Sequence, residues 1–167
     1  AGLDLAQDLG RGAVLRLGPA TCSAFAWVLP ARARDGVHAV FYSERHESPG
    51  PVTLHDACVS WGRRDGEPWL HVHADWTLPD GTRCCGHLLP DEVVLATPMT
   101  VSAWCLDGAG FEVQADAHTG FSLFRVAGGG ADTAEGLLVR LAPNVDVCQS
   151  LVSLVAALGL VAQSEWQ

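Results

Sequence analysis

Residues 69–89 contain the feature that most constrains the fold, because two short segments of alternating polarity flank a turn sequence. In an extended strand, successive side chains point to opposite faces. The first segment therefore predicts a strand with one buried face and one polar face. The residues expected to face the core are Leu70, Val72, Ala74 and Trp76, and those expected on the other face are His71, His73 and Asp75.

The turn sequence Pro79-Asp80-Gly81 decides which face the next histidine occupies. This sequence suits a three-residue hairpin loop, with Pro and Asp in a type I turn and Gly in the left-handed conformation. Counting outward from such a loop, His73 faces His87 on the second strand. In the same register, Asp75 faces Cys85. A two-residue loop would instead slip the pairing by one residue and place His87 on the opposite face.

Three histidines would then converge on one face, with His71 diagonal to His87 and His73 directly opposite it. Three imidazoles with one open position are a common catalytic zinc arrangement. Imidazole also suits Ni, Cu, Co and Fe, so zinc or another divalent transition metal is predicted. Asp75 or Cys85 could add a ligand or hold an imidazole in place. The alternative is three solvent-facing histidines without a metal ion.

The charge balance disfavours direct binding of nucleic acid. The formal net charge is −9, and Arg supplies every basic residue, since the chain has no Lys. A nucleic-acid-binding protein is expected to carry a basic patch. The two local basic clusters, Arg32 with Arg34 and Arg63 with Arg64, are short. An oligomer could still concentrate Arg on one surface.

The cysteines and the apolar segments bear on location. The chain has six cysteines and no Cys-x-x-Cys pair, which differs from the framework of a small secreted disulfide protein. We therefore expect reduced cysteines and a cytoplasmic protein. No apolar run reaches the roughly 18 residues of a membrane-spanning helix, so no membrane association is expected.

The remaining sequence predicts further short strands, separated by Gly, Pro and Asp turns. They are expected at 12–19, 24–31, 37–43, 54–62, 99–106, 110–115 and 121–126. Residues 127–136 are small, Gly-rich and polar, which is typical of a linker. After it, residues 137–167 predict a strand, a helix and a strand, with the helix capped by Asn144 or Asp146 and ending near Leu158.

The ends of the chain also echo each other, because LGLVAQSEW near the C-terminus resembles AGLDLAQDLG at the N-terminus. This echo indicates that the chain opens at the end of one repeat's helix and closes just past the same point of the next repeat. The final strand, helix and strand would then complete one domain in permuted order, or a neighbour's domain by exchange. Coincidence is the alternative for so short a match.

The histidine segments give the sequence a family resemblance. WLHVHADW followed by GTRCCGHLLPDE resembles the plant-and-prokaryote conserved (PPC) domain, with its His-x-His pair, Gly turn and Gly-Gly-His-Leu. Trp61-Gly62, Asp65-Gly66 and the FSLF stretch are similar too, and GLLVRLAPNVDVCQSLVSLVAALGL resembles the family's opening strand and helix. The chain departs from the pattern at Cys85, where the family usually has the first Gly.

The resemblance implies an α+β fold, in which a strongly bent antiparallel β-sheet or sandwich packs with a helix. On this reading, residues 1–126 form a PPC-like domain that lacks its first strand and helix. The family implies a homo-oligomer, commonly a trimer, and metal binding through these same histidines. Its plant members carry an Arg-Gly-Arg-Pro AT-hook for DNA, which this sequence lacks. The fold also resembles acetolactate decarboxylase, an enzyme with a three-His zinc site, although fold alone does not establish function.

Two hypotheses of function follow. The first is an oligomeric, PPC-like metal-binding domain with a regulatory or DNA-associated role. The second is a metal-dependent enzyme, decarboxylase-like or hydrolase-like, that works at the three-His centre. Glu92 is the candidate general base for the second hypothesis, and its alternative role is that of an ordinary surface carboxylate.

Overall fold

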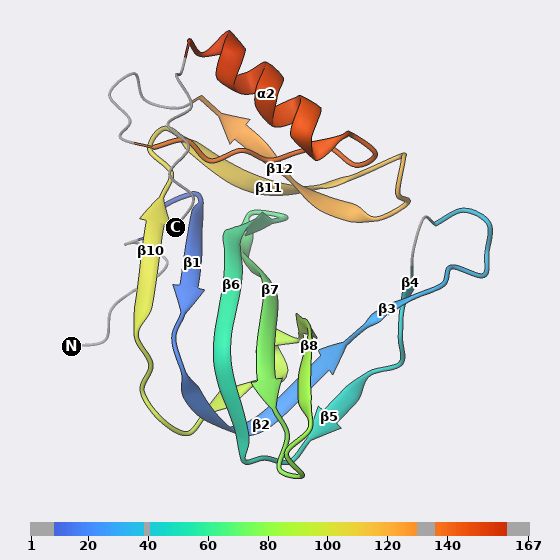
Figure 1. Ribbon diagram of the computed structural model, residues 1–167, viewed down its shortest axis with the longest axis vertical. Coiled ribbons are helices and arrows are strands. Elements are labelled where there is room, and N and C mark those ends of the chain that lie inside the picture. The colour runs from blue at the N-terminus through green and yellow to red at the C-terminus, as the bar shows by residue number, and fades with distance from the viewer. Residues whose placement is uncertain (1–8, 39–40, 130–135, 160–167) are drawn as a thin grey trace. The chain divides into compact units, whose positions relative to one another are not determined.

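The computed structural model of the 167-residue chain describes residues 9–38, 41–129 and 136–159. The chain divides into two compact units, Ala1–Glu135 and Gly136–Gln167. The first unit contains all the described strands and the second contains the α-helix (Figure 1). No described helix is long and apolar enough to cross a membrane.

The first unit is built mainly from one mostly antiparallel sheet of ten described strands. In chain order, the strands are β1 (Ala13–Leu17), β2 (Ala20–Val28), β3 (Pro30–Ala31), β4 (Phe41–Tyr42), β5 (His46–Ser48), β6 (Val52–Arg64), β7 (Glu67–Thr77), β8 (Arg83–Leu88), β9 (Val94–Leu95), β10 (Val101–Cys105), β11 (Ala109–Ala115) and β12 (Ser122–Gly128). The main path of the sheet runs β10-β1-β6-β7-β8-β2-β5, and β3 with β4 forms a separate ribbon.

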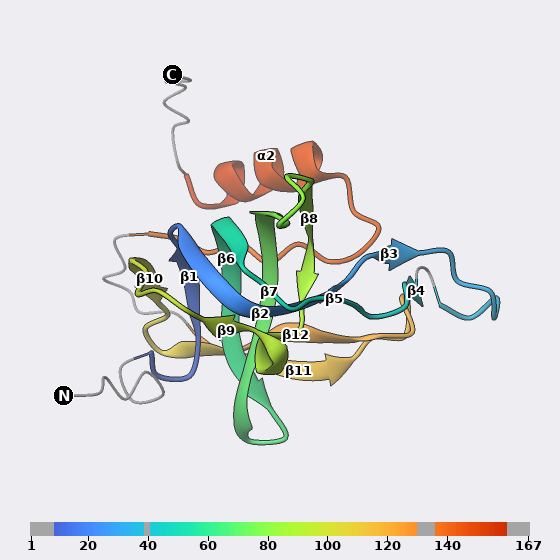
Figure 2. The same ribbon diagram turned by 90° about the horizontal axis from the view of Figure 1, so that it is seen from below.

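Strand β2 bends the sheet back on itself. Its first part pairs with β6, where Ala20 lies opposite Leu54. Its last residues pair with β8, where Trp27 lies opposite Leu88. Because β6, β7 and β8 are also neighbours, β2 joins the two outer strands of this group and crosses the group as Figure 2 shows.

The core lies inside this closed group of strands. Trp76 on β7 is 0% exposed, and its ring centroid lies 5.0 Å from that of Phe25 and 5.3 Å from that of Trp27. Aromatic rings at such distances pack efficiently and bury large apolar areas. The alternation predicted for β7 is confirmed, since Val72, Ala74 and Trp76 are buried. The histidines of β7 therefore face outward.

Strands β11 and β12 form a hairpin that meets the rest of the sheet at the far end of β6 (Figure 1). The only described ladder pair between β11 and β6 joins Glu112 and Arg63 in parallel. The approach is close, because a Cβ added to Gly62 would lie 2.6 Å from Cβ of Phe111. Glycine at this position lets the hairpin pack directly on the backbone of β6.

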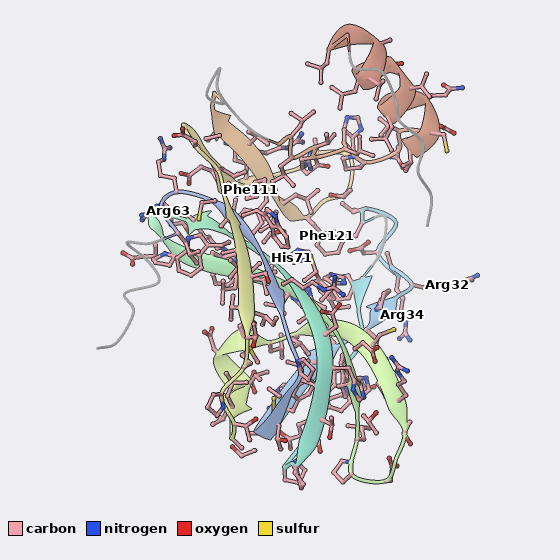
Figure 3. All side chains as sticks on the ribbon, turned by 60° about the vertical axis from the view of Figure 1, so that its left-hand side comes forward. Arg32, Arg34, Arg63, His71, Phe111 and Phe121 are labelled. Atoms are coloured by element: carbon pink, nitrogen blue, oxygen red, sulfur yellow. The ribbon has the colours of Figure 1, made fainter. Side chains whose placement is uncertain are left out.

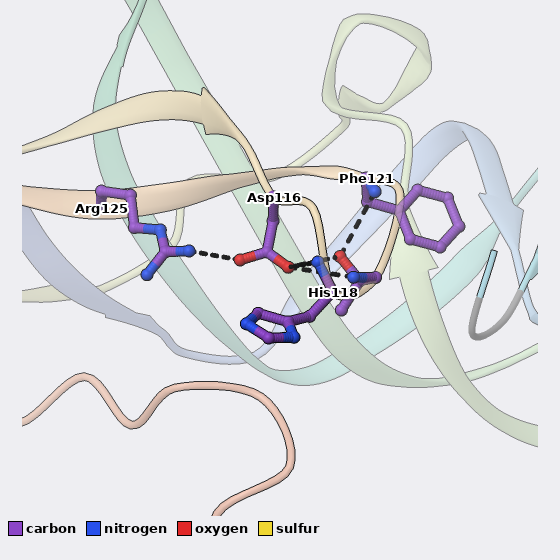
Figure 4. A network of polar contacts seen from close by, with 5 residues as sticks. Asp116, His118, Phe121 and Arg125 are labelled. Carbon is purple, nitrogen blue, oxygen red and sulfur yellow. Dashed lines mark hydrogen bonds and ion pairs between the residues drawn. The ribbon is translucent and has the colours of Figure 1, made fainter. Parts of the chain in front are cut away.

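The turn between β11 and β12 is organised by Asp116, which is 2% exposed (Figure 4). Its Oδ1 accepts hydrogen bonds from the backbone amides of His118 and Thr119 at 3.1 and 3.0 Å, and from Oγ1 of Thr119 at 3.1 Å. Its Oδ2 pairs with Arg125. The Asp116 amide also donates to the carbonyl of Phe121 at 2.7 Å, so this network fixes where Phe121 lies.

The second unit contains helix α2 (Val147–Ala157), close to the predicted range. Asp146 is its N-cap and accepts a hydrogen bond from the amide of Gln149 at 2.7 Å, as one of the two predicted caps. Residues 136–143 were expected to form a strand but have no ladder partner among the described residues. The echo between the chain ends falls mostly on residues 1–8 and 160–167, which lie outside the described residues.

Two further boundaries differ from expectation because pairing across the sheet overrides local composition. Strand β12 continues to Gly128, opposite Ala109, and so takes up the first two residues of the segment expected as a linker. The polar segment after the strand expected at 37–43 contains β5, which pairs with β2. Of that expected strand itself, only β4 forms among the described residues.

Candidate metal centre

The β7–β8 hairpin has the predicted three-residue loop. The amide of Leu78 donates to the carbonyl of Thr82 at 2.9 Å, which closes the loop, and Gly81 has the left-handed φ of +85°. Beyond it, His73 pairs with His87 and Asp75 pairs with Cys85. The predicted register is therefore confirmed, and it places His87 on the same face as the histidines of β7.

The three imidazoles converge. One potential ligand nitrogen from each of His71, His73 and His87 lies within 4.8 Å of the others. The ring centroid of His71 lies 4.9 Å from the ring centroid of His73 and 4.9 Å from that of His87. The ring centroids of His73 and His87 are 5.4 Å apart. Three nitrogen donors so close together form a possible metal site.

The environment favours the neutral form of two of these imidazoles. Burial, followed by the charges of His87 and His73, lowers the pKa of His71 from 6.5 to about 4. Burial and the charge of His73 also lower the pKa of His87. Neutral imidazole is the form that binds a metal ion. In addition, Nδ1 of His87 is buried and has no hydrogen-bond partner among the described residues, so the donor set fits a bound metal ion.

The two additional candidates lie beside this cluster but are not among its grouped donor atoms. The Asp75 carboxylate accepts a hydrogen bond from Nε of Arg83 at 2.9 Å and forms an ion pair with that guanidinium. Arg83 also lowers the pKa of Asp75. Cys85 is exposed and lies opposite Asp75. A role for either residue in metal binding stays a prediction.

Glu92 ends the short 3-10 helix η1 (Pro90–Glu92), and its carboxylate is paired with a cation. Nε of Arg45 donates to Oε2 of Glu92 at 2.8 Å, and Arg45 also pairs with Glu47. The Glu92 carboxylate is not among the donor atoms grouped with the three imidazoles. Its role as a general base stays a prediction.

The structure adds neighbours that the sequence reasoning did not identify. On β6, Ser60 pairs with His71 and Cys58 pairs with His73, so both side chains share the histidine face. The signal for these two was present, because Asp65-Gly66 has the left-handed φ values of a two-residue hairpin turn and sets the β6–β7 register. The ring of Tyr42 lies 5.5 Å from that of His87, and no local pattern indicated this contact.

Comparison with solved structures assigns the fold to the PPC class. No protein-family model matches the sequence, and no curated protein matches it significantly. Solved structures do match, over 72–74% of the chain and with 10–20% sequence identity. The expected fold, a mostly antiparallel sheet with one described α-helix, is therefore confirmed as that of PPC-domain structures.

Three of these structures illustrate the likeness. A plant- and prokaryote-conserved (PPC) protein from Pyrococcus horikoshii has a TM-score of 0.53 and 17% identity, over 72% of this chain and 77% of its own. A "putative DNA-binding protein" from Ralstonia eutropha JMP134 has a TM-score of 0.52 and 16% identity, over 72% of this chain and 78% of its own. A metal-containing protein from Archaeoglobus fulgidus has a TM-score of 0.53 and 20% identity, over 72% of this chain and 79% of its own. At these identities, the likeness shows the fold.

Proposed function

We propose that this chain is a metal-binding protein of the PPC fold, in which His71, His73 and His87 hold one divalent transition metal ion. The observation that carries the proposal is the grouping of three imidazole nitrogens within 4.8 Å of one another. Zinc is the first choice, because three histidines with a fourth open position suit it well. Cobalt, nickel, copper and iron also bind imidazole.

The state of the imidazoles supports this proposal. Proton binding competes with metal binding, and the lowered pKa values of His71 and His87 reduce that competition near neutral pH. Coordination of His87 through Nδ1 would also give this buried atom the partner that the described residues do not supply. Unpaired buried polar atoms are costly, so a bound ion would stabilise the fold.

The role that we propose is regulatory, within a homo-oligomer of three chains in the cytoplasm, and any association with DNA would be through that assembly. Among the described strands, β10 lies at an edge of the sheet, where Trp104 is 59% exposed. An exposed edge strand with a large apolar side chain favours pairing with another chain. Direct DNA binding is disfavoured because Arg16, Arg45 and Arg83 are paired with carboxylates of the same chain.

The second candidate is a metal-dependent enzyme of decarboxylase or hydrolase type. It is supported by a donor set of only three imidazoles, which leaves a coordination position for a water or a substrate oxygen. A bound metal ion would polarise a carbonyl or acidify its water. The carboxylate of Glu92 is paired with Arg45 and is therefore not free to act as a base. For this reason we prefer the binding role.

Metal analysis of the purified protein tests the proposal. We expect one metal ion per chain by mass spectrometry of the wild type, and loss of most of it in His73→Ala. His118→Ala is the matched control, because His118 is exposed and lies outside the cluster. Cobalt loading should give the visible absorption of a four-coordinate or five-coordinate ion in the wild type and the control. Undiminished metal content in His73→Ala would reject the assignment.

A further inference from the structure

Two aromatic rings, Tyr42 and Phe121, form a wall beside the three-His cluster. The ring centroid of Tyr42 lies 5.5 Å from that of His87 and 5.8 Å from that of Phe121. Tyr42 belongs to β4, Phe121 to the β11–β12 turn and His87 to β8, so three separate segments meet here. Figure 3 labels Phe121, from the β11–β12 turn, and His71, from β7.

A third ring, that of His38, packs against this aromatic wall. Its centroid lies 5.1 Å from that of Phe121. Nδ1 of His38 is 2.5 Å from Oδ2 of Asp35, and Oδ1 of Asp35 accepts from the amides of Val37 and His38. Hydrogen bonds from those amides are the main reason that the pKa of Asp35 falls to about 2. The carboxylate is therefore ionised at neutral pH and keeps the imidazole oriented.

Gly120 lets His38 reach this position. A Cβ at Gly120 would lie 2.8 Å from Cδ2 of His38, and the φ of Gly120 is +74°, so a larger residue would displace the ring. On the other side of the turn, the Asp116 network fixes the backbone of Phe121. The aromatic wall is thus braced by two independent sets of hydrogen bonds and does not depend on the histidine cluster for its position.

The aromatic wall is not simply part of the core. Tyr42 is 47% exposed and Phe121 is partly exposed, whereas the rings of the core, such as Trp76, are fully covered. Exposed aromatic faces next to a functional group supply contact area to a bound molecule at low entropic cost. The side of the cluster next to Tyr42 is therefore suited to the apolar body of a ligand.

The charge of the metal centre indicates which chemical group the other end of that ligand would carry. Three neutral imidazoles around a divalent ion leave a net charge of about +2, which attracts an anionic oxygen donor. We propose, resting on the metal site proposed above, that the centre binds a small organic anion whose head ligates the metal and whose flat aromatic ring packs against Tyr42 and Phe121.

The test compares two chelators that share one head group, benzohydroxamate and acetohydroxamate, on the cobalt-loaded protein. Binding is followed by the change in the cobalt absorption spectrum. We expect benzohydroxamate to bind about tenfold more tightly, the size of effect expected for one or two aromatic contacts. Tyr42→Ala and Phe121→Ala should remove most of this preference and leave cobalt affinity unchanged.

Phe41→Ala is the matched control, because Phe41 is also an exposed aromatic residue of β4, but its described ring contact is with His38. This variant should retain the preference. Equal binding of the two chelators by the wild type, or an undiminished preference in both wall variants, would overturn the inference. Failure of the wild type to bind cobalt would instead overturn the metal site itself.

A second readout does not depend on chelators. Tyr42 is the single tyrosine of the chain, so labelling with 3-fluorotyrosine gives one fluorine resonance. Paramagnetic cobalt at the cluster should broaden or shift that resonance strongly in the wild type, and not in His73→Ala. Both chelators change the cobalt coordination alike, so benzohydroxamate should move the resonance further than acetohydroxamate does, because only its ring reaches Tyr42. A resonance indifferent to benzohydroxamate would contradict contact between the ligand and Tyr42.

Discussion

His73 and His87 lie directly opposite each other on β7 and β8, with ring centroids 5.4 Å apart and ring planes at 90°. This pairing depends on the length of the loop that joins the strands, since a change of one residue in register would reverse the face of His87. The metal centre is therefore a product of turn geometry as much as of histidine spacing.

Gly81→Ala should destabilise the protein. Gly81 has a φ of +85°, and a residue with a Cβ loses about 1 kcal/mol or somewhat more in this conformation. Urea unfolding should show a lower midpoint with an unchanged slope. Gly129→Ala is the control, because an added Cβ there would meet no atom within 4 Å and its φ is not left-handed. Equal midpoints for the two variants would show that the loop conformation is not needed.

Zinc should stabilise the folded chain. A ligand that binds only the folded state at about 100 times its Kd adds about 2.7 kcal/mol to the free energy of unfolding. Thermal unfolding with and without zinc, and again after a chelator, measures this effect. His87→Ala should lose the response and His118→Ala should keep it. A response that survives in His87→Ala would place the zinc elsewhere.

The metal-free protein should lose stability as the pH falls from about 6.5 to about 4. In the unfolded chain, His71 takes up a proton near its ordinary pKa of 6.5, but in the folded chain its pKa is about 4. Between these values the unfolded state binds more protons, so acid favours unfolding. Above pH 6.5 this effect is absent. Denaturant unfolding at several pH values should show that the free energy of unfolding falls more steeply with decreasing pH in the wild type than in His71→Gln.

The titration itself is measurable by nuclear magnetic resonance of the histidine Cε1 protons. The His71 signal should titrate well below 6.5, the ordinary value for histidine, in the metal-free protein. With zinc bound, the titration midpoint of the His71 signal should move to still lower pH, since protons must displace the ion. A His71 midpoint near 6.5 in the metal-free protein would show that the ring is not desolvated.

Asp116→Ala should destabilise the β11–β12 turn more than Asp116→Asn. Alanine leaves the amides of His118 and Thr119 without their acceptor and Arg125 without its partner, whereas asparagine retains an acceptor oxygen. Thermal melts should rank the wild type above Asp116→Asn, and Asp116→Asn above Asp116→Ala. The alanine variant should also weaken the benzohydroxamate preference, because Phe121 is no longer held. Equal melting of the two variants would show that the hydrogen bonds to Asp116 contribute little.

Much of the site's geometry could be predicted from local sequence. The turn Pro79-Asp80-Gly81 specifies its own conformation, and strand alternation then determines the face of each histidine. Helix α2 was predictable for a similar reason, since Asp146 caps it through a contact with Gln149 three residues away. In both cases, the interacting groups are close in sequence.

The rest depends on contacts between distant segments. Nothing in residues 20–28 indicates that β2 pairs with both β6 and β8, because this is decided by how the sheet closes. Tyr42 reaches His87 only after the β3–β4 ribbon is placed, and Phe121 approaches only through the β11–β12 turn. The extension of β12 to Gly128 likewise follows from its partner Ala109.

The double pairing of β2 has a consequence for the order of folding. Strands β6, β7 and β8 are consecutive and joined by short turns, so their contacts close small loops at low entropic cost. Strand β2 precedes them and must find both outer members of the group, which is a slower search among non-local contacts. We therefore expect the strands that carry the three imidazoles to pair before β2 docks, so that the local part of the fold assembles the metal-ligand set.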